Sequence, residues 1–524
     1  MPKITYLTTP LYYVNAAPHI GHSYTEVAAD CLARYARLRG DDVFFLTGTD
    51  EHGEKIAQAA AAKGLSPKAF VDQAADTFTS LWQALGIAGS YDRFIRTTDP
   101  DHERIVQAVL QHLYDHKQLE LGTQTFWYCV PCETSFGMSE IDAITPVCQN
   151  CRRPVSSVEE QDYYLNLEAH RAWLKGYIQS HDRFILPAER RNEVLAMLEH
   201  PLPNLCITRP KSRVAWGIEV PFDTRYVTYV WFDALLNYIS ALGWPGDEKF
   251  RRYWGDSGGA MHLIGKDIIR HHALYWPIIL RALGVEPPKT IFAHGWWKIG
   301  EQKMSKSLGN IVDPTVIVGQ LLTGQPYAAD VYRYFLLREV PFGQDGSFSE
   351  DAIVKRLDSD LANDLGNLVN RTLSMVERYS QGNIPPPPAV GCAVEDAPLR
   401  QAVVALPQAV EAAMARIEFS AALEAVMRVV SHANQYIEQT APWKLAKQPD
   451  MAPRLGAVLH GLGEVIRVVA ILLEPFMPSV AQAMWEQLGC GTRPRRLEDA
   501  GTWPGLPVGQ AIGPHPVLFP KATP

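Results

Sequence analysis

The chain has 524 residues, of which 47% are hydrophobic and 20% are charged; this length and balance exclude an intrinsically disordered chain and predict several domains. It carries 49 Lys and Arg residues against 57 Asp and Glu residues, a net charge of −8, so nucleic-acid binding cannot depend on a general positive field. The 8 cysteines are too few for a disulfide scaffold, and we find no signal peptide or apolar run that would span a membrane, so we expect a reduced, cytoplasmic protein.

The N-terminal part of the chain alternates strand and helix patterns. Strands are predicted over Ile4–Thr9 and Asp42–Gly48, and amphipathic helices over Ser23–Arg39, Ser66–Leu85 and Asp101–Gln118. This alternation predicts an α/β fold with a doubly wound parallel sheet.

Between about Leu119 and Glu160 the pattern changes to short strands and paired cysteines, which indicate an insertion. Strand and helix patterns return over Tyr226–Leu242, His262–Leu283 and Thr290–Ile299. We therefore expect the insertion to split the parallel sheet, which is completed after it.

From Ala329 onward the sequence has helical periodicity almost throughout, including Val354–Tyr379, Val410–Gln439 and Ala457–Gln487. Residues 501–524 are rich in Pro and Gly and predict an extended tail that packs across the surface or frays. The second half of the chain is therefore predicted to be all-α.

The first candidate site is the sequence PHIGH at residues 18–22, where the first strand leads into a helix. His19 and His22 should share one face of the first helical turn, whose free N–H groups and positive dipole end suit a phosphate. Gly21 leaves room for an adenine or phosphate to approach the backbone. Alone, this motif could equally be two surface histidines in a turn.

The second candidate site is the sequence KMSKS at residues 303–307, on a loop after the strand pattern 290–299. The ammonium groups of Lys303 and Lys306, among small hydroxyls, would make a mobile cationic clamp for a transferring phosphate chain. By itself the motif could be a solvated basic loop. The sequence contains no P-loop motif, which disfavours a P-loop nucleotidase.

The third candidate site consists of two C-x-x-C pairs, Cys129 with Cys132 and Cys148 with Cys151. Four thiolates at this spacing predict a tetrahedral Zn²⁺ site with a closed coordination shell, which stabilises structure and leaves no position for catalysis. Free thiols and disulfides are the alternatives, and a reducing compartment disfavours disulfides.

The histidine and lysine motifs together, in this order and context, resemble the signature pair of the class I aminoacyl-tRNA synthetases. Within that class the resemblance is to methionyl-tRNA synthetases of the bacterial single-chain type with one zinc knuckle, and it extends from about Ile4 to Leu488. The stretches that carry it are PLYYVN at 10–15, TGTDEHG at 47–53, YVWFDA at 229–234 and IGKD at 264–267.

The resemblance implies a division of the chain into functional parts. We expect a Rossmann-like catalytic domain from residues 1–118 and 226–300, a connective insertion at 119–225 with a zinc knuckle at 129–151, a KMSKS loop and stem-contact region at 301–350, a helical-bundle anticodon-binding domain at 351–490 and an extended tail at 491–524. The ending shows no further folded domain of the kind that makes some family members dimers, so a monomer is expected.

The resemblance also implies a methionine pocket, and the residue types suit one. Trp231, Ala234 and Tyr238 fall on one helix face, and Ile268 and His272 on another, giving an apolar, aromatic surface for a thioether. Each residue alone could equally be core packing. The full set expected to bind methionine is Leu11, Tyr13, Asp50, Trp231, Ala234, Tyr238, Ile268 and His272.

The implied reaction has two steps: the methionine carboxylate attacks the α-phosphate of ATP to give methionyl-adenylate and pyrophosphate, and the terminal adenosine of tRNA(Met) then accepts methionine. Positioning and charge stabilisation suffice for the first step, with Mg²⁺ accompanying ATP. Asp50 would hold the substrate ammonium and Asp267 the ribose. The implied catalytic residues are His19, His22, Lys303 and Lys306, and the implied ATP ligands are His19, Gly21, His22, Gly265, Asp267 and Lys306.

In the helical half, Asn367 and Arg371 are four residues apart, on one helix face, and Trp443 follows a proline. These positions resemble the anticodon-binding residues of the family. Trp443 would stack on a splayed loop base, while Asn367 and Arg371 would contact base edges or phosphate. Without the resemblance, Trp443 would be taken as a core residue.

Three alternatives stay open at this point: a class I synthetase for another amino acid, a non-catalytic tRNA-binding relative, and a zinc-stabilised nucleic-acid-binding protein. Synthetases for branched amino acids usually carry a large editing insertion, and the cysteine enzyme needs an open zinc site. The intact histidine and lysine motifs argue against the two non-catalytic alternatives. Amino-acid-dependent ATP–pyrophosphate exchange would separate all of them.

Overall fold

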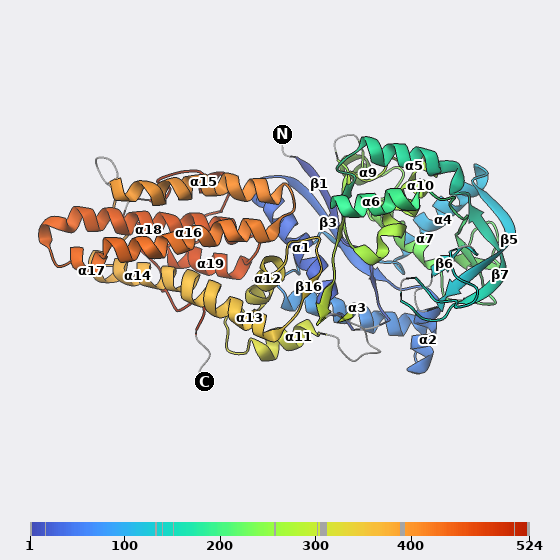
Figure 1. Cartoon of the computed structure of the whole chain (residues 1–524), viewed down its shortest axis with the longest axis horizontal. Coiled ribbons are helices and arrows are strands. Elements are labelled where there is room, and N and C mark those ends of the chain that lie inside the picture. The colour runs from blue at the N-terminus through green and yellow to red at the C-terminus, as the bar shows by residue number, and fades with distance from the viewer. Residues whose placement is uncertain are drawn as a thin grey trace.

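A parallel sheet lies in the middle of the molecule, with an inserted module on one side and a bundle of long helices on the other (Figure 1). This computed structural model describes residues 3–15, 17–130, 134–138, 140–149, 151–255, 258–300, 302–303, 312–387, 394–507 and 509–520. The predicted α/β fold followed by an all-α part is confirmed.

The sheet has the strand order β2-β3-β1-β12-β13-β8, with β4 paired to β3, and all of these pairs are parallel. Parallel strands place their carboxyl ends at one edge of the sheet, where a ligand can contact several loops at once. The strands are β1 (Ile4–Thr8), β2 (Tyr12–Tyr13), β3 (Asp42–Asp50), β4 (Arg93–Arg96), β8 (Ile185–Leu186), β12 (Ala260–Gly265) and β13 (Thr290–His294).

Alternate residues of the central strands enter different cores, because side chains of a strand point to opposite faces of the sheet. On β1, Leu7 belongs to one core and Tyr6 to the other, and on β3 the same division separates Phe45 from Phe44. The helices of this part are α1 (Ile20–Leu38), α2 (Glu54–Ala62), α3 (Pro67–Ala84), α4 (Pro100–Asp115), α7 (Val230–Leu235), α8 (Asn237–Ser240), α9 (Glu248–Tyr253) and α10 (Trp276–Ala282).

The inserted module is built on an antiparallel sheet of order β6-β5-β7-β9. Its long ribbon pairs β5 with β7 from Leu119 opposite Leu165 to Tyr128 opposite Ser156. The same stretch of chain also supplies β8 to the parallel sheet, so the range 119–225 is not wholly separate from the catalytic sheet. Its elements are β5 (Leu119–Cys129), β6 (Thr134–Phe136), β7 (Ser156–Leu165), α5 (Glu168–Ser180), α6 (Ala188–Met197), β9 (Leu205–Cys206) and β10 (Thr208–Pro210), which pairs with β11 (Tyr226–Thr228).

The chain leaves the sheet through short elements and then forms the bundle. The short elements are β14 (Trp297–Ile299), β15 (Gln302–Lys303), α11 (Pro314–Val316) and β16 (Gly346–Ser347). The helices of this half, the first of which precedes β16, are α12 (Ala328–Arg338), α13 (Glu350–Arg356), α14 (Asn367–Ser380), α15 (Ala397–Met414), α16 (Phe419–Thr440), α17 (Pro442–Leu445), α18 (Ala452–Leu473), α19 (Pro478–Gln487) and α20 (Leu497–Ala500).

Two stretches predicted to be helical contain a break. Val410–Gln439 is divided between α15 and α16, and the turn includes Ile417 with a positive φ of 61°. Ala457–Gln487 is divided between α18 and α19. Apolar periodicity continues across a tight turn between antiparallel helices, so periodicity alone does not locate such a turn.

The segment Pro449–Leu473 is long and apolar enough to cross a membrane by length and composition, which the sequence-based expectation did not identify. However, 83% of its most apolar window is buried inside the molecule. A helix that is apolar on every side is expected at the centre of a bundle, and this burial accounts for its composition.

The tail after α20 packs on the bundle. The carboxylate of Glu464 in α18 accepts hydrogen bonds from the backbone N–H groups of Gly505 (2.8 Å) and Leu506 (2.5 Å). Further along, Leu518 and Phe519 are buried in the core of the bundle. The described part of the tail is therefore held by specific contacts, as expected for a tail that packs across the surface.

Candidate active site

The start of α1 is fixed by its two histidines. His19 is the N-cap residue: its Nδ1 accepts a hydrogen bond from Gly21 N–H (3.0 Å), and His22 Nδ1 accepts one from His19 N–H (3.1 Å). The two rings stack with their centroids 3.9 Å apart. A Cβ on residue 21 would lie 2.9 Å from the His19 ring, so a larger residue there would displace this ring from its capping position.

This arrangement corrects one expectation about the helix start. The N–H of Ile20 donates to Val312 O (3.1 Å) and that of Gly21 donates to His19, so these backbone groups are engaged within the protein. The helix start therefore presents its imidazole rings and its positive dipole end to the neighbouring cavity, instead of free N–H groups.

A cavity of about 420 Å³ opens at the carboxyl edge of the parallel sheet. Its walls come from the ends of β1, β3, β12 and β13 and from α1 and α7. The predicted residues that line it are Leu11, Tyr13, His19, Gly21, His22, Asp50, Trp231, Ala234, Tyr238, Gly265, Asp267, Ile268 and His272. The side chain of Lys303 and all of Lys306 lie outside the described residues.

One wall of the cavity is aromatic and uncharged. His272 donates from Nδ1 to Ile268 O (3.0 Å), so its Nε2 accepts the hydroxyl of Tyr238 (2.8 Å). Burial lowers the pKa of His272 to about 4, which keeps the ring neutral. Beside it, the Trp231 indole stacks on His271 at a centroid distance of 3.8 Å. This wall suits an apolar, polarizable side chain.

A buried hydrogen-bonded network joins the end of β3 to α7. Asp233 accepts from His52 through Oδ2 (2.7 Å) and from His102 through Oδ1 (2.7 Å). Burial alone would raise the pKa of Asp233, but these two histidines lower it below its usual value. The network thereby holds the helix that carries Trp231 against the strand that ends in Asp50, and the sequence motifs did not predict it.

The end of the cavity beside Gly265 and Asp267 is polar. The indole N–H of Trp296 donates to Asp267 Oδ1 (3.1 Å), and a Cβ on residue 265 would come within 2.7 Å of the same oxygen. Glycine at position 265 therefore leaves the Asp267 carboxylate accessible from the backbone side. A flat, polar group such as a nucleoside fits this end.

Several lining residues were not predicted. Thr25 donates to Nε2 of His294 (2.7 Å), whose Nδ1–H donates to Gly295 O (2.8 Å), and burial lowers the pKa of His294. His294 ends β13, whereas the sequence pattern extended one strand from 290 to 299. A shorter strand would have placed residues 294–297 at the carboxyl edge, where ligands bind.

A carboxyl group is also buried beneath the cavity. Glu26 of α1 is completely buried, and its Oε2 accepts hydrogen bonds from Tyr12 Oη (2.7 Å) and Thr47 Oγ1 (2.9 Å). Burial raises the pKa of Glu26 to about 8, and the hydrogen bonds only partly oppose this shift. Glu26 is therefore largely protonated at neutral pH, directly behind the Tyr12 ring that lines the cavity.

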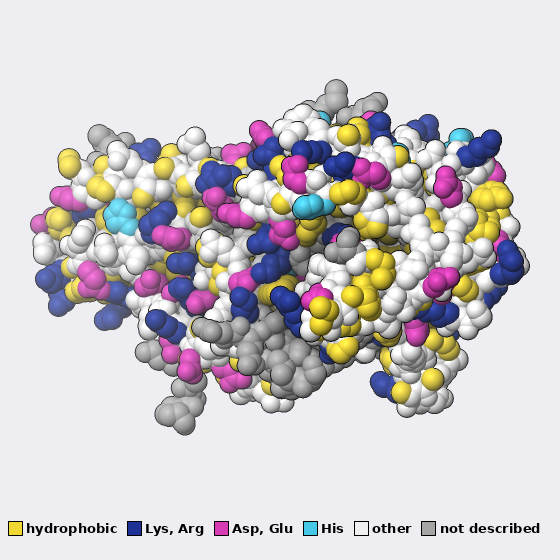
Figure 2. Space-filling view, turned by 45° about the vertical axis from the view of Figure 1, so that its right-hand side comes forward, with side chains coloured by type: hydrophobic (Ala, Val, Ile, Leu, Met, Phe, Trp, Pro, Cys, Tyr) yellow, Lys and Arg dark blue, Asp and Glu magenta, His cyan; other side chains and the backbone are white. Residues whose placement is uncertain are grey.

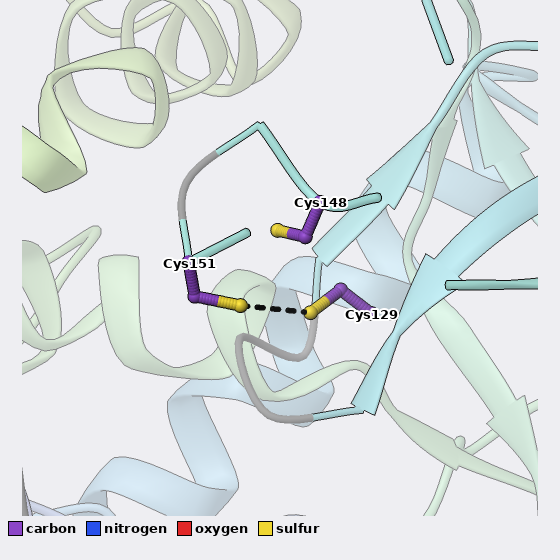
Figure 3. Close-up of side chains that lie close together, drawn as sticks. All are labelled: Cys129, Cys148 and Cys151. Atoms are coloured by element: carbon purple, nitrogen blue, oxygen red, sulfur yellow. Dashed lines mark hydrogen bonds between the residues drawn. The ribbon is translucent and has the colours of Figure 1, made fainter. Parts of the chain in front are cut away.

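The cysteine cluster lies in the inserted module, where Cys129 ends β5 and faces Cys151 (Figure 3). The sulfur atoms of Cys129, Cys148 and Cys151 lie within 4.8 Å of one another, and those of Cys129 and Cys151 are 3.6 Å apart. Sulfurs bound to one tetrahedral Zn²⁺ at about 2.3 Å are about 3.8 Å apart, whereas a disulfide needs about 2.05 Å, so the cluster has the spacing of a metal site. Cys132 lies outside the described residues.

The predicted anticodon-binding residues lie at the end of the bundle remote from the sheet. The Arg371 guanidinium lies 5.7 Å from the ring centroid of Trp443 and pairs with Glu438 (2.7 Å). Asn367 begins α14, one turn before Arg371. Figure 2 shows Lys and Arg side chains grouped at this tip of the molecule, and Lys444 in α17 is exposed.

A parallel sheet with a histidine-capped helix after its first strand, a cavity at its carboxyl edge, and a helical bundle after it is the architecture of a class I aminoacyl-tRNA synthetase. A family model described as tRNA synthetases class I (M) matches residues 5–373, and one described as the anticodon binding domain of methionyl tRNA ligase matches residues 387–524.

Individual methionine–tRNA ligases are also similar to this chain over nearly its whole length. The methionine–tRNA ligase of Caldanaerobacter subterraneus subsp. tengcongensis is 47% identical over 528 residues, covering 99% of this chain and 79% of the relative. That of Thermotoga maritima is 41% identical over 519 residues, covering 98% and 80%. The crystal structure of Mycobacterium tuberculosis methionyl-tRNA synthetase bound by methionyl-adenylate superimposes with a TM-score of 0.91 at 41% identity, covering 99% of this chain and 100% of that chain.

The chain therefore belongs to the methionyl-tRNA synthetase family. It is an ATP-dependent ligase that activates methionine and charges tRNA. The alternative of a synthetase for a different amino acid is not supported, because the similarity to methionine enzymes covers nearly the whole chain.

Glu26 gives a prediction about stability. The folded protein holds this carboxyl protonated up to about pH 8, whereas the unfolded chain ionises near 4.5. Folding is therefore favoured by this group below pH 4.5 and loses that contribution as pH rises to about 8. Glu26→Gln keeps an acceptor for Tyr12 and Thr47 but does not titrate. The free energy of unfolding of the variant, relative to that of the wild type, should therefore rise by about 1.4 kcal/mol for each pH unit across this window. Urea unfolding over the window measures this gain, and parallel pH profiles for the two proteins would contradict the assignment.

Proposed function

We propose that methionine and ATP bind next to each other in the cavity at the carboxyl edge of the sheet. The observation that carries this proposal is that one cavity is lined both by the aromatic wall around Tyr238 and by the histidine-capped start of α1. The amino acid and the nucleotide must meet in one place, since the carboxylate of one attacks the α-phosphate of the other. A cavity of about 420 Å³ is within the range of small-molecule sites.

Methionine is held at both of its ends. Trp231, Ala234, Tyr238, Ile268 and His272 surround the thioether, and the neutral state of His272 adds no charge that would exclude it. The remaining residues proposed to bind methionine lie nearer the amino and carboxylate groups of the substrate. They are Leu11, Tyr13 and Asp50, whose carboxylate binds the substrate ammonium.

ATP occupies the other end. Gly265 and Asp267 bind the adenosine, with the carboxylate on the ribose, and Gly21 lets the nucleotide approach the start of α1. His19 and His22 meet the phosphates. Lys303 and Lys306, together with Mg²⁺ brought by ATP, neutralise the charge that develops on the leaving pyrophosphate.

The proposed pocket is tested by making it smaller. Ala234→Leu should raise the methionine KM in ATP–pyrophosphate exchange by about tenfold or more, because the added carbons occupy space meant for the thioether. The KM for ATP should stay within about twofold, because the nucleotide binds at the other end.

The same exchange assay, run on wild type with each of the twenty amino acids, should respond to methionine alone. An unchanged methionine KM in the Ala234→Leu variant, with the protein folded, would show that methionine binds elsewhere.

We further propose that Cys129, Cys132, Cys148 and Cys151 bind one structural Zn²⁺. The spacing of the three described sulfur atoms supports this, as does the complete burial of Cys129 and Cys148. Bound there, the ion would fix the turns around it, in a region whose own core is small. Four thiolate ligands leave no open position, so the ion has no part in the chemistry.

Metal analysis of the purified wild type should find one Zn²⁺ per chain. The double variant Cys129→Ser/Cys132→Ser should contain none, and limited proteolysis should then cleave it within residues 129–151. Cys206→Ser, a change at a cysteine of the same module outside the cluster, is the control and should keep the metal. A wild-type protein that is metal-free and fully active would contradict the proposal.

Recognition of tRNA is assigned to the remote end of the bundle. Trp443 is only partly buried and has the Arg371 guanidinium over its ring, an arrangement that suits stacking of an unpaired base. Asn367 and Arg371 contact base edges or phosphate there. With a net charge of −8, a few specific contacts must supply the binding energy. We place the enzyme in the cytoplasm and expect it to act as a monomer.

Trp443→Ala should weaken aminoacylation by about one to two orders of magnitude, since stacking of one base contributes about 1–3 kcal/mol. ATP–pyrophosphate exchange without tRNA should stay near the wild-type rate. Trp173→Ala is a matched control, because Trp173 is also partly buried beside a guanidinium, that of Arg281 at 4.3 Å, but lies in the inserted module. If Trp443→Ala lost exchange activity as well, Trp443 would be a packing residue.

A further inference from the structure

The tip of the inserted module, the part around the cysteine cluster between Trp127 and Val155, has a small core of its own. Its buried side chains, among them Trp127, Phe136 and Ile141, are separate from the two large cores. Between this tip and the segment after β12 lies a second cavity of about 230 Å³, with Phe136 on one wall and His271 and Tyr275 on the other. Side-chain packing therefore does not fully connect the tip to that segment.

An ion pair spans the two sides. Arg270 Nη1 lies 2.8 Å from Glu140 Oε1, and both side chains are only about a fifth to a quarter exposed, at 20% and 25%. Glu140 is itself fixed within the tip, because its Oε2 accepts Gly137 N–H (2.6 Å) and its backbone carbonyl accepts the Gln149 amide (2.6 Å). Glu140, whose carboxylate faces Arg270, is thus tied both to the turn that begins at Gly137 and to Gln149, which follows Cys148.

Arg270 lies inside the segment that forms the aromatic wall of the active-site cavity. Ile268 and His272, two residues before and after it, line that cavity. The segment is irregular: a 3₁₀ turn over Lys266–Ile268 is followed by a π-helical turn over His271–Tyr275. Irregular helical turns have poorer hydrogen-bond geometry than an α-helix, so their side-chain directions depend more on outside contacts.

We propose that Glu140, acting through Arg270, is a positioning residue for methionine binding. The ion pair holds the 3₁₀ and π-helical turns at the place where Ile268 and His272 close around the methionine side chain. This inference rests on the assignment of that cavity to methionine. Neither Glu140 nor Arg270 lines the cavity, so both act through the segment that does.

The test measures ATP–pyrophosphate exchange in variants that break the ion pair between Glu140 and Arg270. Glu140→Gln and Arg270→Gln should each raise the methionine KM by about two- to fivefold, the range that partly exposed ion pairs give, with kcat and the KM for ATP nearly unchanged. The double variant Glu140→Gln/Arg270→Gln should raise the KM no further than either single change, because both changes break the same ion pair. Equilibrium dialysis with methionine alone should show the same order of affinities.

Two controls separate positioning from a general loss of structure. Zinc content and thermal midpoint should be unchanged in Glu140→Gln. Glu199→Gln breaks a more exposed ion pair with Lys175 (2.8 Å) in the same module, neither of whose residues lines the cavity, and should leave the methionine KM unchanged.

The outcomes distinguish this inference from the proposal on which it rests. If Ala234→Leu raises the methionine KM but Glu140→Gln does not, the pocket assignment stands and the positioning role is wrong. If neither variant changes the KM, the pocket assignment and the positioning role are both wrong. Rises in KM that simply add in Glu140→Gln/Arg270→Gln would also overturn the positioning role, because the two residues would then act independently.

Discussion

The two halves of the molecule are joined by a buried ion pair on the same helix that begins the active site. Asp30, in the middle of α1, pairs at 2.5 Å with Arg333 of α12, and both side chains are completely buried. The Arg333 guanidinium also donates to the backbone carbonyls of Pro475 and Phe476 between α18 and α19, and Asp30 accepts from Arg34. Desolvation of both charges is unfavourable, and this full set of partners offsets it. The helix that begins with His19 is thereby fixed to the bundle, so the orientation of the bundle relative to the cavity follows from α1.

Burial keeps two titratable groups neutral, one in the wall of the cavity and one behind it. Desolvation keeps His272 neutral, and Glu26 behind the cavity is largely neutral for the same reason. A protonated His272 would repel the ammonium group of an amino acid and weaken the attraction of Asp50. An ionised Glu26 would repel the phosphates of a nucleotide near His22. The neutral state of both groups therefore leaves the charge of the cavity to Asp50, Asp267 and Lys55, which line it, and to the positive dipole end of α1.

Much of this arrangement could be predicted from the sequence because it depends on local patterns. β1, β3 and α1 follow from residue periodicity, and the positions of His19, Trp231 and Asp267 follow from motifs at strand ends. The remainder depends on contacts between distant segments. The network of Asp233 with His52 and His102 joins three segments that have no common pattern, and the breaks near Ile417 and after α18 do not interrupt apolar periodicity. The capping of α1 by its own histidines was missed for a different reason, since the ring geometry that engages Gly21 N–H is not specified by residue type.

The tRNA contact proposed at the remote end of the bundle would let an acidic protein select a polyanion. Arg371 already has a partner, Glu438, which is 62% exposed, so any anion that approaches the guanidinium must compete with a carboxylate in water. Such an exposed pair contributes at most about 1 kcal/mol, so the exchange of one anion for another is nearly neutral in energy. A phosphate alone therefore gains little there. In the proposed contact, a loop base that also covers the Trp443 ring would gain the stacking energy in addition. Such a contact would favour an unpaired base next to a phosphate over duplex backbone, which offers only the charge.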